Sequence, residues 1–175
     1  MPYSSEKEMY PEVVEWLQRY LRDRYRRAEV TVIDTSSRSL VRVIADQAFE
    51  AALPLQSASW DIHVDVVGFI ASRTEVSLAF VECKLYEITL KDVAQLLGYS
   101  VVAKPKHAFI ISPAGPSGSL RSLLKTYNRI DILRYQHEQG AIPWSMVVAR
   151  WSEETRSIDR SSVIADDRSR LGRLS

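Results

Sequence analysis

The 175-residue sequence has one cysteine, three histidines and no long apolar run. A single cysteine excludes an internal disulfide framework and a zinc site built from several thiolates, and it suits a reducing compartment. No apolar run approaches the roughly 18 residues of a membrane span, and the N-terminus lacks the apolar core of a signal peptide. The scattered histidines form no HExxH zinc motif. We therefore expect a cytoplasmic protein with no membrane association.

The composition is typical of a globular protein, with 46% hydrophobic and 26% charged residues. The length is enough for one domain with a substantial core and too short to expect two. The end of the chain is polar and contains several arginines. We predict one domain over residues 1–155, followed by a polar, arginine-bearing tail over residues 156–175.

The net charge of +1 does not by itself indicate a nucleic-acid partner, but the arginines are unevenly distributed. One set lies near the end of the first predicted helix and the other in the tail. The two sets are Arg19, Arg22, Arg24, Arg26 and Arg27, and Arg156, Arg160, Arg168, Arg170 and Arg173. Arginine is well suited to binding phosphate, although a solvated surface that supports a helix is the simpler interpretation of each residue.

Hydrophobic periodicity predicts helices and strands that alternate along the chain. The expected helices cover residues 5–25, 89–103 and 119–128. The expected strands cover residues 29–34, 38–45, 60–71, 76–84, 107–112, 130–135 and 143–151. Pro11 is tolerated only near a helix start, so the residues before it can form a separate turn. This order indicates an α/β or α+β domain with a mixed central β-sheet flanked by helices.

The third and fourth predicted strands form a hairpin that brings acidic residues together. If the polar residues 72–75 form its turn, Ala71 lies opposite Val76, and the same register places Asp65 opposite Glu82. Two carboxylates that face each other in a mostly apolar hairpin repel, unless a cation lies between them. A one-residue slip would move the whole set to the other face, so the prediction depends on this register.

Asp65 and Glu82 are therefore candidate ligands of Mg²⁺ or Mn²⁺, because hard divalent cations prefer oxygen ligands. Lys84 lies on the same face as Glu82 and can orient a metal-bound water or stabilise charge on a phosphate. Cys83 points to the other face and is expected to pack in the core. The simpler interpretation is that Glu82 and Lys84 form an ordinary exposed salt bridge, worth under about 1 kcal/mol.

Three other residues near this pair have two interpretations each. Asp61 shares a face with Asp65 and competes with it, although Asp65 is the one that faces Glu82. His63 can touch the metal or a phosphate, or it is an ordinary strand histidine. Glu6 falls on the apolar face of the first helix, where a carboxylate is costly unless it pairs or binds metal. Alternatively, Glu6 lies in a frayed first turn, where the helix dipole favours a negative charge.

The order of these features resembles the PD-(D/E)XK nuclease superfamily, which includes restriction-endonuclease-like, Holliday-resolvase-like and RecB-like enzymes. The matching residues are Asp65-Val-Val-Gly on one strand and Val81-Glu82-Cys83-Lys84 at the end of the next, with a helix before them and a helix and strand after them. Val64 departs from the pattern, because the motif has proline before the aspartate. The resemblance covers about residues 5–135.

The resemblance also extends to the two flanking helices. Gln95-Leu-Leu-Gly-Tyr99 fits the QxxxY pattern that RecB-like members carry on the helix after ExK. The opening Glu6-Lys-Glu-Met-Tyr-Pro is similar to the first helix of small members, in which a glutamate completes the metal site. The resemblance therefore implies that Glu6 supports the metal site and that Gln95 and Tyr99 orient the substrate or Lys84.

For the whole chain, the resemblance implies a restriction-endonuclease-like fold and a Mg²⁺- or Mn²⁺-dependent deoxyribonuclease of the restriction, repair or recombination type. Asp65 and Glu82 would bind the metal, and Lys84 would assist catalysis. The alternative is a catalytically inactive nucleic-acid-binding or assembly module on the same fold. A homodimer, or a subunit of a larger complex, is compatible with either function.

Two further features have a functional and a simpler interpretation. Trp144 and Trp151 can stack on bases, but core or interface packing is the simpler role. The loop over residues 115–118 lacks the Walker lysine and the GxSxG spacing, so we expect an ordinary loop whose amides could at most contact a phosphate.

Overall fold

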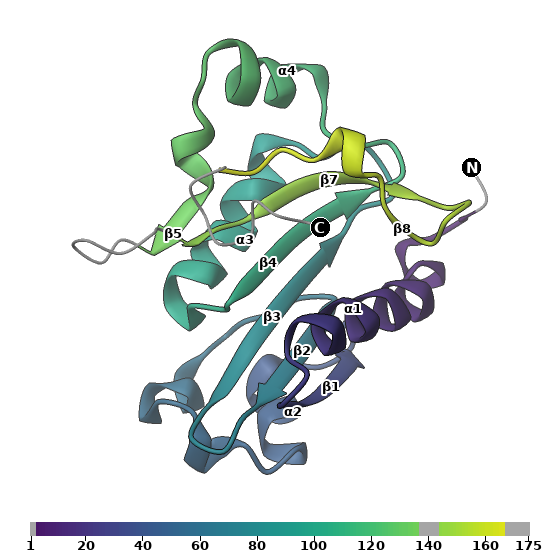
Figure 1. Ribbon diagram of the computed structural model, residues 1–175. Helices are drawn as coiled ribbons and strands as arrows, with labels where there is room; N and C mark the ends of the chain where they lie inside the picture. The colour runs from purple at the N-terminus through teal and green to yellow at the C-terminus, as the bar shows by residue number, and fades with distance from the viewer. Residues whose placement is uncertain (1–2, 137–143, 167–175) are drawn as a thin grey trace.

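The structure is a computed structural model that describes residues 3–136 and 144–166. It is an α/β fold with a curled, mixed, six-stranded sheet in the order β1-β2-β3-β4-β7-β8 (Figure 1). The strands are β1 (Glu29–Asp34), β2 (Val66–Ala71), β3 (Val76–Cys83), β4 (His107–Ser112), β7 (Val147–Ser152) and β8 (Ser157–Ile158). β1, β2 and β3 are antiparallel, β3, β4 and β7 are parallel, and β8 returns antiparallel to β7. The predicted α/β class with a mixed sheet is confirmed.

Helices cover both faces of this sheet. The α-helices among the described residues are α1 (Tyr10–Arg24), α2 (Leu40–Asp46), α3 (Leu90–Ala103) and α4 (Gly118–Arg121). The 3-10 helices are η1 (Glu6–Glu8), η2 (Glu50–Ala52), η3 (Leu55–Ser59), η5 (Ile130–Leu133) and η6 (Arg160–Ser162), and η4 (Ser122–Thr126) is a π-helix that continues α4. A separate ribbon pairs β5 (Arg134–Gln136) with β6 (Trp144–Ser145). None of the helices in residues 3–136 and 144–166 combines the length and apolar character that a membrane span requires.

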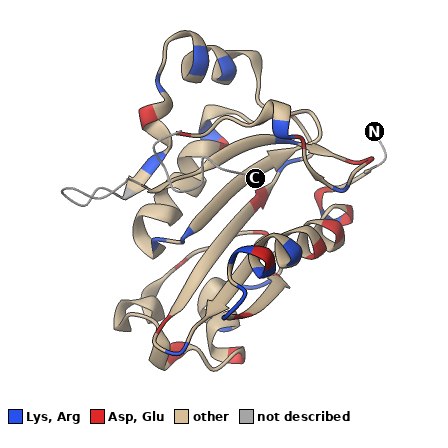
Figure 2. Cartoon of the chain, viewed as in Figure 1, with Lys and Arg blue, Asp and Glu red and all other residues tan. Residues whose placement is uncertain are grey.

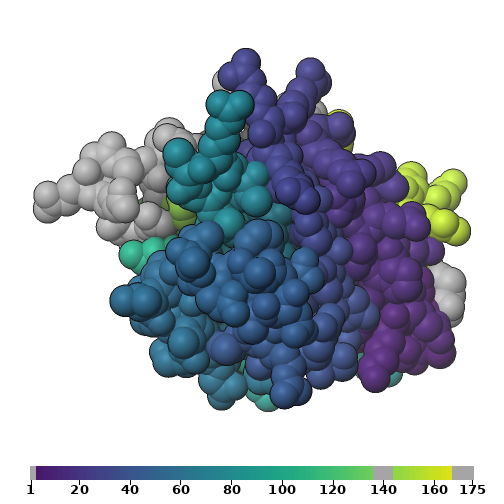
Figure 3. Space-filling view, turned by 90° about the horizontal axis from the view of Figure 1, so that it is seen from below, coloured from purple at the N-terminus to yellow at the C-terminus, as the bar shows by residue number. Residues whose placement is uncertain are grey.

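The alternation of strand side chains divides the core into two halves. On β3, Leu78 and Phe80 pack with α2, α3 and α4, whereas Ala79, Val81 and Cys83 pack with α1 on the other face. Seen from below, the surface of the molecule is formed mainly by the first half of the chain (Figure 3). Since side chains alternate, Glu82 projects to the face opposite Cys83.

The start of α1 follows the sequence prediction closely. Residues 6–8 form a separate 3-10 turn, and Pro11 lies in the first turn of α1, where its missing N–H costs nothing. Val13, Leu17 and Leu21 recur on one buried stripe and press α1 onto β1 and β2. Because the turn η1 precedes α1, the N-terminal residues lie near the start of β2 and the end of β3.

The hairpin register is the one that the sequence predicts. Ala71 pairs with Val76 and Val66 with Val81, and the Ser72 amide donates to the Glu75 carbonyl at 2.9 Å to close the turn. β3 then connects to the parallel strand β4 through α3. α3 begins with a capping box, in which the Asp92 carboxylate accepts from the backbone N–H of Thr89 at 2.8 Å.

The first hairpin strand is shorter than predicted, because residues 60–65 are not part of the sheet. The buried residues Ile62 and Val64 alternate with the exposed residues Asp61 and His63, so the alternating pattern is real. β1 ends at Asp34, however, and offers no partner strand beyond Val66. Thr35 instead donates from its hydroxyl to the Val64 carbonyl at 2.6 Å, which holds the segment extended without a ladder.

Two other strand predictions are wrong. Residues 38–45 contribute to α2, because the buried residues Leu40, Val43 and Ile44 follow helical spacing despite their β-branched neighbours. Residues 130–135 are mostly the 3-10 turn η5, and only their end enters the short β5. The expected strand over residues 143–151 is divided into β6 and β7, and Pro143 lies outside the described residues.

The segment after residue 155 begins inside the folded unit. β8 pairs with β7, and Ile164 forms an isolated bridge with Val148. Ile158, Ile164 and Asp166 are buried, and Asp166 forms an ion pair with Arg134. The predicted tail arginines at positions 168, 170 and 173 lie outside the described residues.

Candidate functional site

A buried acidic cluster lies where β2 begins and β3 ends. Asp65 immediately precedes β2, Glu82 is the penultimate residue of β3, and Lys84 follows that strand. The register of β2 and β3, in which Val66 faces Val81, makes Asp65 and Glu82 the next opposed pair. Ligands of open α/β sheets bind beyond the carboxyl ends of the parallel strands, and β3 and β4 both end at this edge.

The Asp65 carboxylate is fixed by two donors from different parts of the chain. The Tyr10 hydroxyl donates to its Oδ1 at 2.9 Å, and the Cys83 amide donates to its Oδ2 at 2.8 Å. Burial raises the pKa of Asp65, although these two hydrogen bonds and the charge of Lys84 oppose the shift. Each carboxylate oxygen can accept a second partner, so the orientation of Asp65 is set while it keeps coordinating capacity.

Glu82 is the most buried acid of the cluster, with 6% of its surface exposed. Its Oε1 accepts from Lys84 Nζ at 2.8 Å, whereas its Oε2 is buried and has no hydrogen-bond partner. The pKa of Glu82 is raised to about 7, first by burial and second by the negative charge of Asp65, against the lowering effect of Lys84. A buried oxygen without a partner is costly, so Oε2 is an available acceptor for a hydrogen-bond donor, a proton or a cation.

Lys84 is held as a cation next to these acids. Burial alone would lower its pKa, but the carboxylates of Glu82, Glu6 and Asp65 outweigh that effect and raise it. Its side chain keeps 22% of its surface exposed, so the ammonium lies between the buried cluster and solvent. Lys84 can therefore contact a ligand that approaches from solvent while it stays paired with Glu82.

Glu6, in the turn η1 near the N-terminus, also lies at this cluster. Its Oε1 accepts from the Leu85 amide at 3.3 Å, and its charge contributes to raising the pKa of Asp65 and of Glu82. Glu6 lies in the separate turn η1, where it is half-buried. The structure thus brings Glu6 beside the residues that the sequence predicts as its partners.

The donor set decides which kind of cation would fit. Within residues 3–136 and 144–166, no group of three or more His, Cys, Asp or Glu side chains has the arrangement of a metal centre. Asp65 and Glu82 nevertheless supply opposed carboxylates, and Glu82 Oε2 has no other partner. Mg²⁺ commonly takes one or two carboxylates and completes its shell with water and phosphate, so the residues fit such an ion and do not form an all-protein cage.

The other predicted site residues have surroundings that differ from those of the buried cluster. Gln95 is exposed on α3, and Tyr99 is half-buried and packs against the core under that helix. Asp61 is exposed and lies 3.2 Å from the ring of His63, which is also largely exposed. Asp61 and His63 therefore form a surface pair, and Asp65 is the aspartate that faces the cluster.

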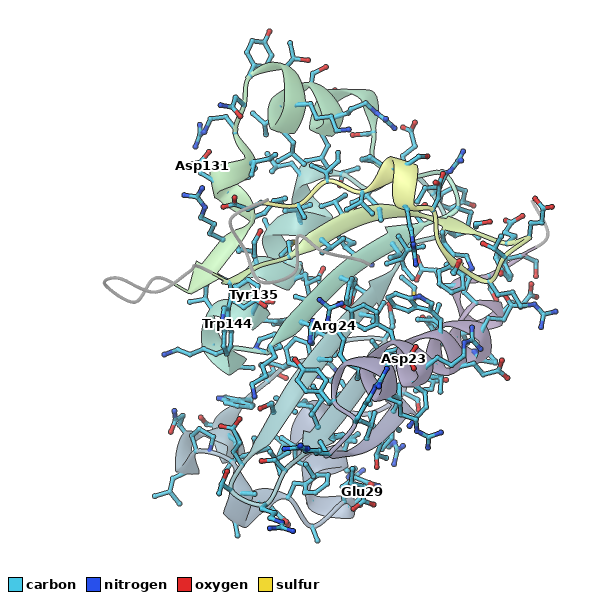
Figure 4. All side chains as sticks on the ribbon, viewed as in Figure 1. Asp23, Arg24, Glu29, Asp131, Tyr135 and Trp144 are labelled. Carbon is cyan, nitrogen blue, oxygen red and sulfur yellow. The ribbon has the colours of Figure 1, made fainter. Side chains whose placement is uncertain are left out.

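Cys83 and the tryptophans have the packing roles that the sequence favours. Cys83 is fully buried, and burial raises the pKa of its thiol, which keeps it protonated. Trp151 is buried in the core against Trp16. Trp144 lies beside Tyr135 (Figure 4), and the centres of their rings are 6.5 Å apart.

The two predicted arginine sets meet at a hollow beside α1. This hollow has a volume of about 280 Å³, and its lining includes Arg19, Asp23 and Arg24 from α1, Arg160 from η6, and Trp16. Basic residues lie toward the C-terminal end of α1 and acidic residues at its N-terminal end (Figure 2). A larger hollow of about 920 Å³ lies between the loop after β4 and the β7–β8 hairpin, and it is lined by residues 113–114 and by residues of that hairpin.

Tyr10 is the site residue that the sequence analysis missed. Its ring is 4% exposed and belongs to the apolar stripe of α1, which is why periodicity assigns it to the core. Burial raises its pKa, and so does the adjacent charge of Asp65, so the hydroxyl stays a donor. The available signal is that a tyrosine on a buried helical stripe needs a partner for its hydroxyl.

Comparisons of this chain with models of protein families, with curated proteins and with solved structures find no match in any of the three. The candidate site therefore has to be interpreted from its own geometry and chemistry.

Proposed function

We propose that this chain is a metal-dependent nuclease that hydrolyses phosphodiester bonds in DNA. The observation that carries the proposal is the buried, unpartnered Oε2 of Glu82, opposed by Asp65 and flanked by a cationic Lys84. A core with no function to serve would gain by replacing such a cluster with apolar residues. The finer fold that we propose is the restriction-endonuclease-like arrangement that the sequence resembles.

Asp65 and Glu82 would hold a Mg²⁺ or Mn²⁺ ion. When bound, this ion would lower the pKa of a coordinated water and neutralise charge that builds on the phosphate. The Tyr10 hydroxyl and the Cys83 amide fix the Asp65 carboxylate, so no reorganisation is needed at this ligand during the reaction. Lys84 lies beside Glu82 and toward solvent, where its ammonium can orient the attacking water or stabilise negative charge on the phosphate.

Hydrolysis forms a bond between the water oxygen and phosphorus and breaks one phosphorus–oxygen ester bond. The proton that the water loses has to be accepted, and the leaving oxygen has to gain one. Three arginines and one aspartate, Asp23, line the hollow beside α1, and this excess of arginine supports a polyanionic substrate because arginine binds phosphate oxygens well. Gln95 and Tyr99 keep their proposed role in orienting the substrate or Lys84, and Gln95 is exposed on α3.

The test is cleavage of single-stranded, duplex and branched DNA, with and without Mg²⁺ or Mn²⁺. The variants are Asp65→Ala and Lys84→Ala, and the matched control is Lys106→Ala, which removes a lysine that pairs with Glu75 away from the cluster. We expect each cluster variant to lose at least about 100-fold in rate, as removal of a preorganised charge commonly does. Activity that is unchanged by both substitutions would rule out the mechanism.

A second candidate function is a nucleic-acid-binding or assembly module without catalysis. The observation that favours it is the Lys84–Glu82 pair at 2.8 Å, together with a Glu82 pKa of about 7, because a proton could satisfy Oε2 instead of a metal. This module would bind DNA in a salt-dependent manner, would need no metal and would not cleave. A Mn²⁺ titration without binding, combined with salt-dependent DNA binding, would favour it over the nuclease.

A further inference from the structure

An exposed tyrosine lies next to the acidic cluster. Tyr86 is two residues beyond Lys84, and 71% of its surface is exposed. Two residues of extended chain span at most about 7 Å, so the Tyr86 backbone lies close to that of Lys84. Leu90, at the start of α3, is 50% exposed and adds apolar surface to the same connection. An exposed aromatic residue therefore lies only two residues along the chain from Lys84.

Hydrogen bonds fix the backbone on both sides of Tyr86. The Leu85 amide donates to Glu6 at 3.3 Å, and the Ser112 hydroxyl donates to the Tyr86 carbonyl at 2.6 Å. Ile88 is fully buried and forms two backbone hydrogen bonds with the loop that follows β4. Its N–H donates to the Gly115 carbonyl, and its carbonyl accepts from the Ser117 N–H, each at 2.9 Å. The loop over residues 115–118 therefore has a structural role that the sequence did not suggest, since it anchors the Tyr86 segment.

Exposure alone does not distinguish Tyr86, because isolated exposed aromatic residues are common. Tyr127 is equally exposed, at 72%, but it follows η4 and is far along the chain from the cluster. Tyr86 combines exposure with an anchored backbone and with proximity to Lys84. A side chain on an anchored backbone loses less conformational freedom when it binds a ligand, and this favours binding.

We infer that Tyr86 is a stacking platform for an unpaired base of a nucleic acid whose phosphate is held at the Asp65–Glu82–Lys84 cluster. The inference rests on the proposed function and narrows its substrate class to single-stranded or locally unpaired nucleic acid. An aromatic ring can stack on a base only where the face of that base is free, and bases inside a duplex already stack on each other. Tyr86 is a specificity-determining residue in this scheme, and it takes no part in the hydrolysis.

The test compares the binding of a labelled single strand with that of a hairpin duplex of the same length, by fluorescence anisotropy. Ca²⁺ replaces Mg²⁺ to limit cleavage. The variants are Tyr86→Ala and Tyr86→Phe, with Tyr127→Ala as the control of matched exposure. A 2-aminopurine base in the single strand adds a direct readout, because its fluorescence falls when it stacks. Thermal unfolding of each variant checks that the fold is kept.

We expect Tyr86→Ala to weaken single-strand binding by about 5- to 150-fold, the range measured for loss of one base–aromatic stack. Tyr86→Phe and Tyr127→Ala should bind like the wild type, and duplex binding should change little in any variant. Single-strand binding that is equal in Tyr86→Ala and Tyr127→Ala would overturn the inference, while cleavage by the same preparations would leave the nuclease proposal standing. A wild-type protein that binds no nucleic acid would overturn both.

Discussion

The Asp65 carboxylate depends on a residue from the first helix for its orientation. Tyr10 begins α1 and donates to Asp65 Oδ1, while the other oxygen accepts from the amide of Cys83. The buried ring of Tyr10 also packs with the apolar residues of α1 and β3. One side chain therefore joins the core to the candidate site, and its two roles can be separated by removing the hydroxyl alone.

We predict that Tyr10→Phe keeps the fold but lowers cleavage by about 10-fold, because Asp65 loses a hydrogen bond of the charged kind. The concentration of Mn²⁺ needed for half-maximal activity should rise as well, since the free carboxylate becomes easier to protonate. The matched control is Tyr135→Phe, which removes a buried hydroxyl that donates to the Pro105 carbonyl at 2.7 Å, away from the cluster. Equal activity in both variants would show that Tyr10 has only a packing role.

At the residue scale, the sequence could predict what depends on local alternation. The opposition of Asp65 and Glu82 follows from a polar turn of four residues and a period of two, and the register confirms it. The arrival of Glu6 at Leu85 and of Tyr10 at Asp65 depends on how α1 packs across the sheet. Those contacts join residues far apart in the chain, and periodicity within one element carries no information about them.

At the scale of elements, the position of α1 depends on a glycine in the strand beneath it. A Cβ at Gly68 would lie 2.6 Å from Leu21 Cδ1 and 3.4 Å from Leu17 Cδ2. Both leucines are fully buried, so neither has free space to move into. Because Gly68 has no side chain, α1 can approach β2 closely, and this approach sets where η1 and Tyr10 lie.

We predict that Gly68→Ala destabilises the protein by about 1–3 kcal/mol, the usual cost of overpacking a core. The matched control is Gly98→Ala on α3, where an added Cβ would meet nothing within 4 Å. That change should stabilise the protein by up to about 1 kcal/mol, because alanine is the better helix former. Chemical denaturation of both variants checks the pair, and a stability loss in Gly98→Ala as large as in Gly68→Ala would contradict the account.

The errors at the element scale have a common physical cause. Residues 38–45 are rich in β-branched residues, yet the burial of Leu40, Val43 and Ile44 requires one helical face, and tertiary packing overrides the strand preference. Residues 60–65 alternate as a strand should, but β1 ends before it can pair with them. In both cases the local pattern predicts correctly which residues are buried. Whether they form a helix or a strand depends on the neighbouring element, which the local pattern does not show.

For the whole molecule, a buried histidine links α1 to the centre of the sheet. His107 begins β4, is 4% exposed, and its Nε2 lies 2.7 Å from the Tyr25 hydroxyl. Its Nδ1 is buried without a hydrogen-bond partner. Burial, reinforced by the charges of Arg24 and Lys106, lowers the pKa of His107 to about 3, so the ring stays neutral in the folded protein.

This neutral ring makes global stability depend on pH. The unfolded chain takes up a proton on His107 below about pH 6.5, whereas the folded protein does so only near pH 3, so stability is lost as the pH falls through that window. Between pH 7 and pH 5 we predict a loss of about 2 kcal/mol from this residue. Urea unfolding of the wild type and of His107→Phe checks the value, and an equal loss in both would refute it.

Whole-molecule assembly also brings the two arginine sets together. Arg19 and Arg24 come from α1 and Arg160 from η6, and all three line one hollow. The sequence shows the two clusters but not their convergence, because the polar composition of residues 156–175 predicts a tail and gives no sign of β8 and η6. Their meeting depends on the pairing of β8 with β7 at the edge of the sheet.

The most direct test of the account is a crystal of this protein soaked in Mn²⁺ and measured for anomalous scattering. If Asp65 and Glu82 hold a divalent cation, an anomalous peak will lie between their carboxylates, in contact with Glu82 Oε2, and it will be absent in Asp65→Ala. A crystal that binds Mn²⁺ elsewhere, while Glu82 stays paired only with Lys84, would contradict the metal site and the nuclease built on it.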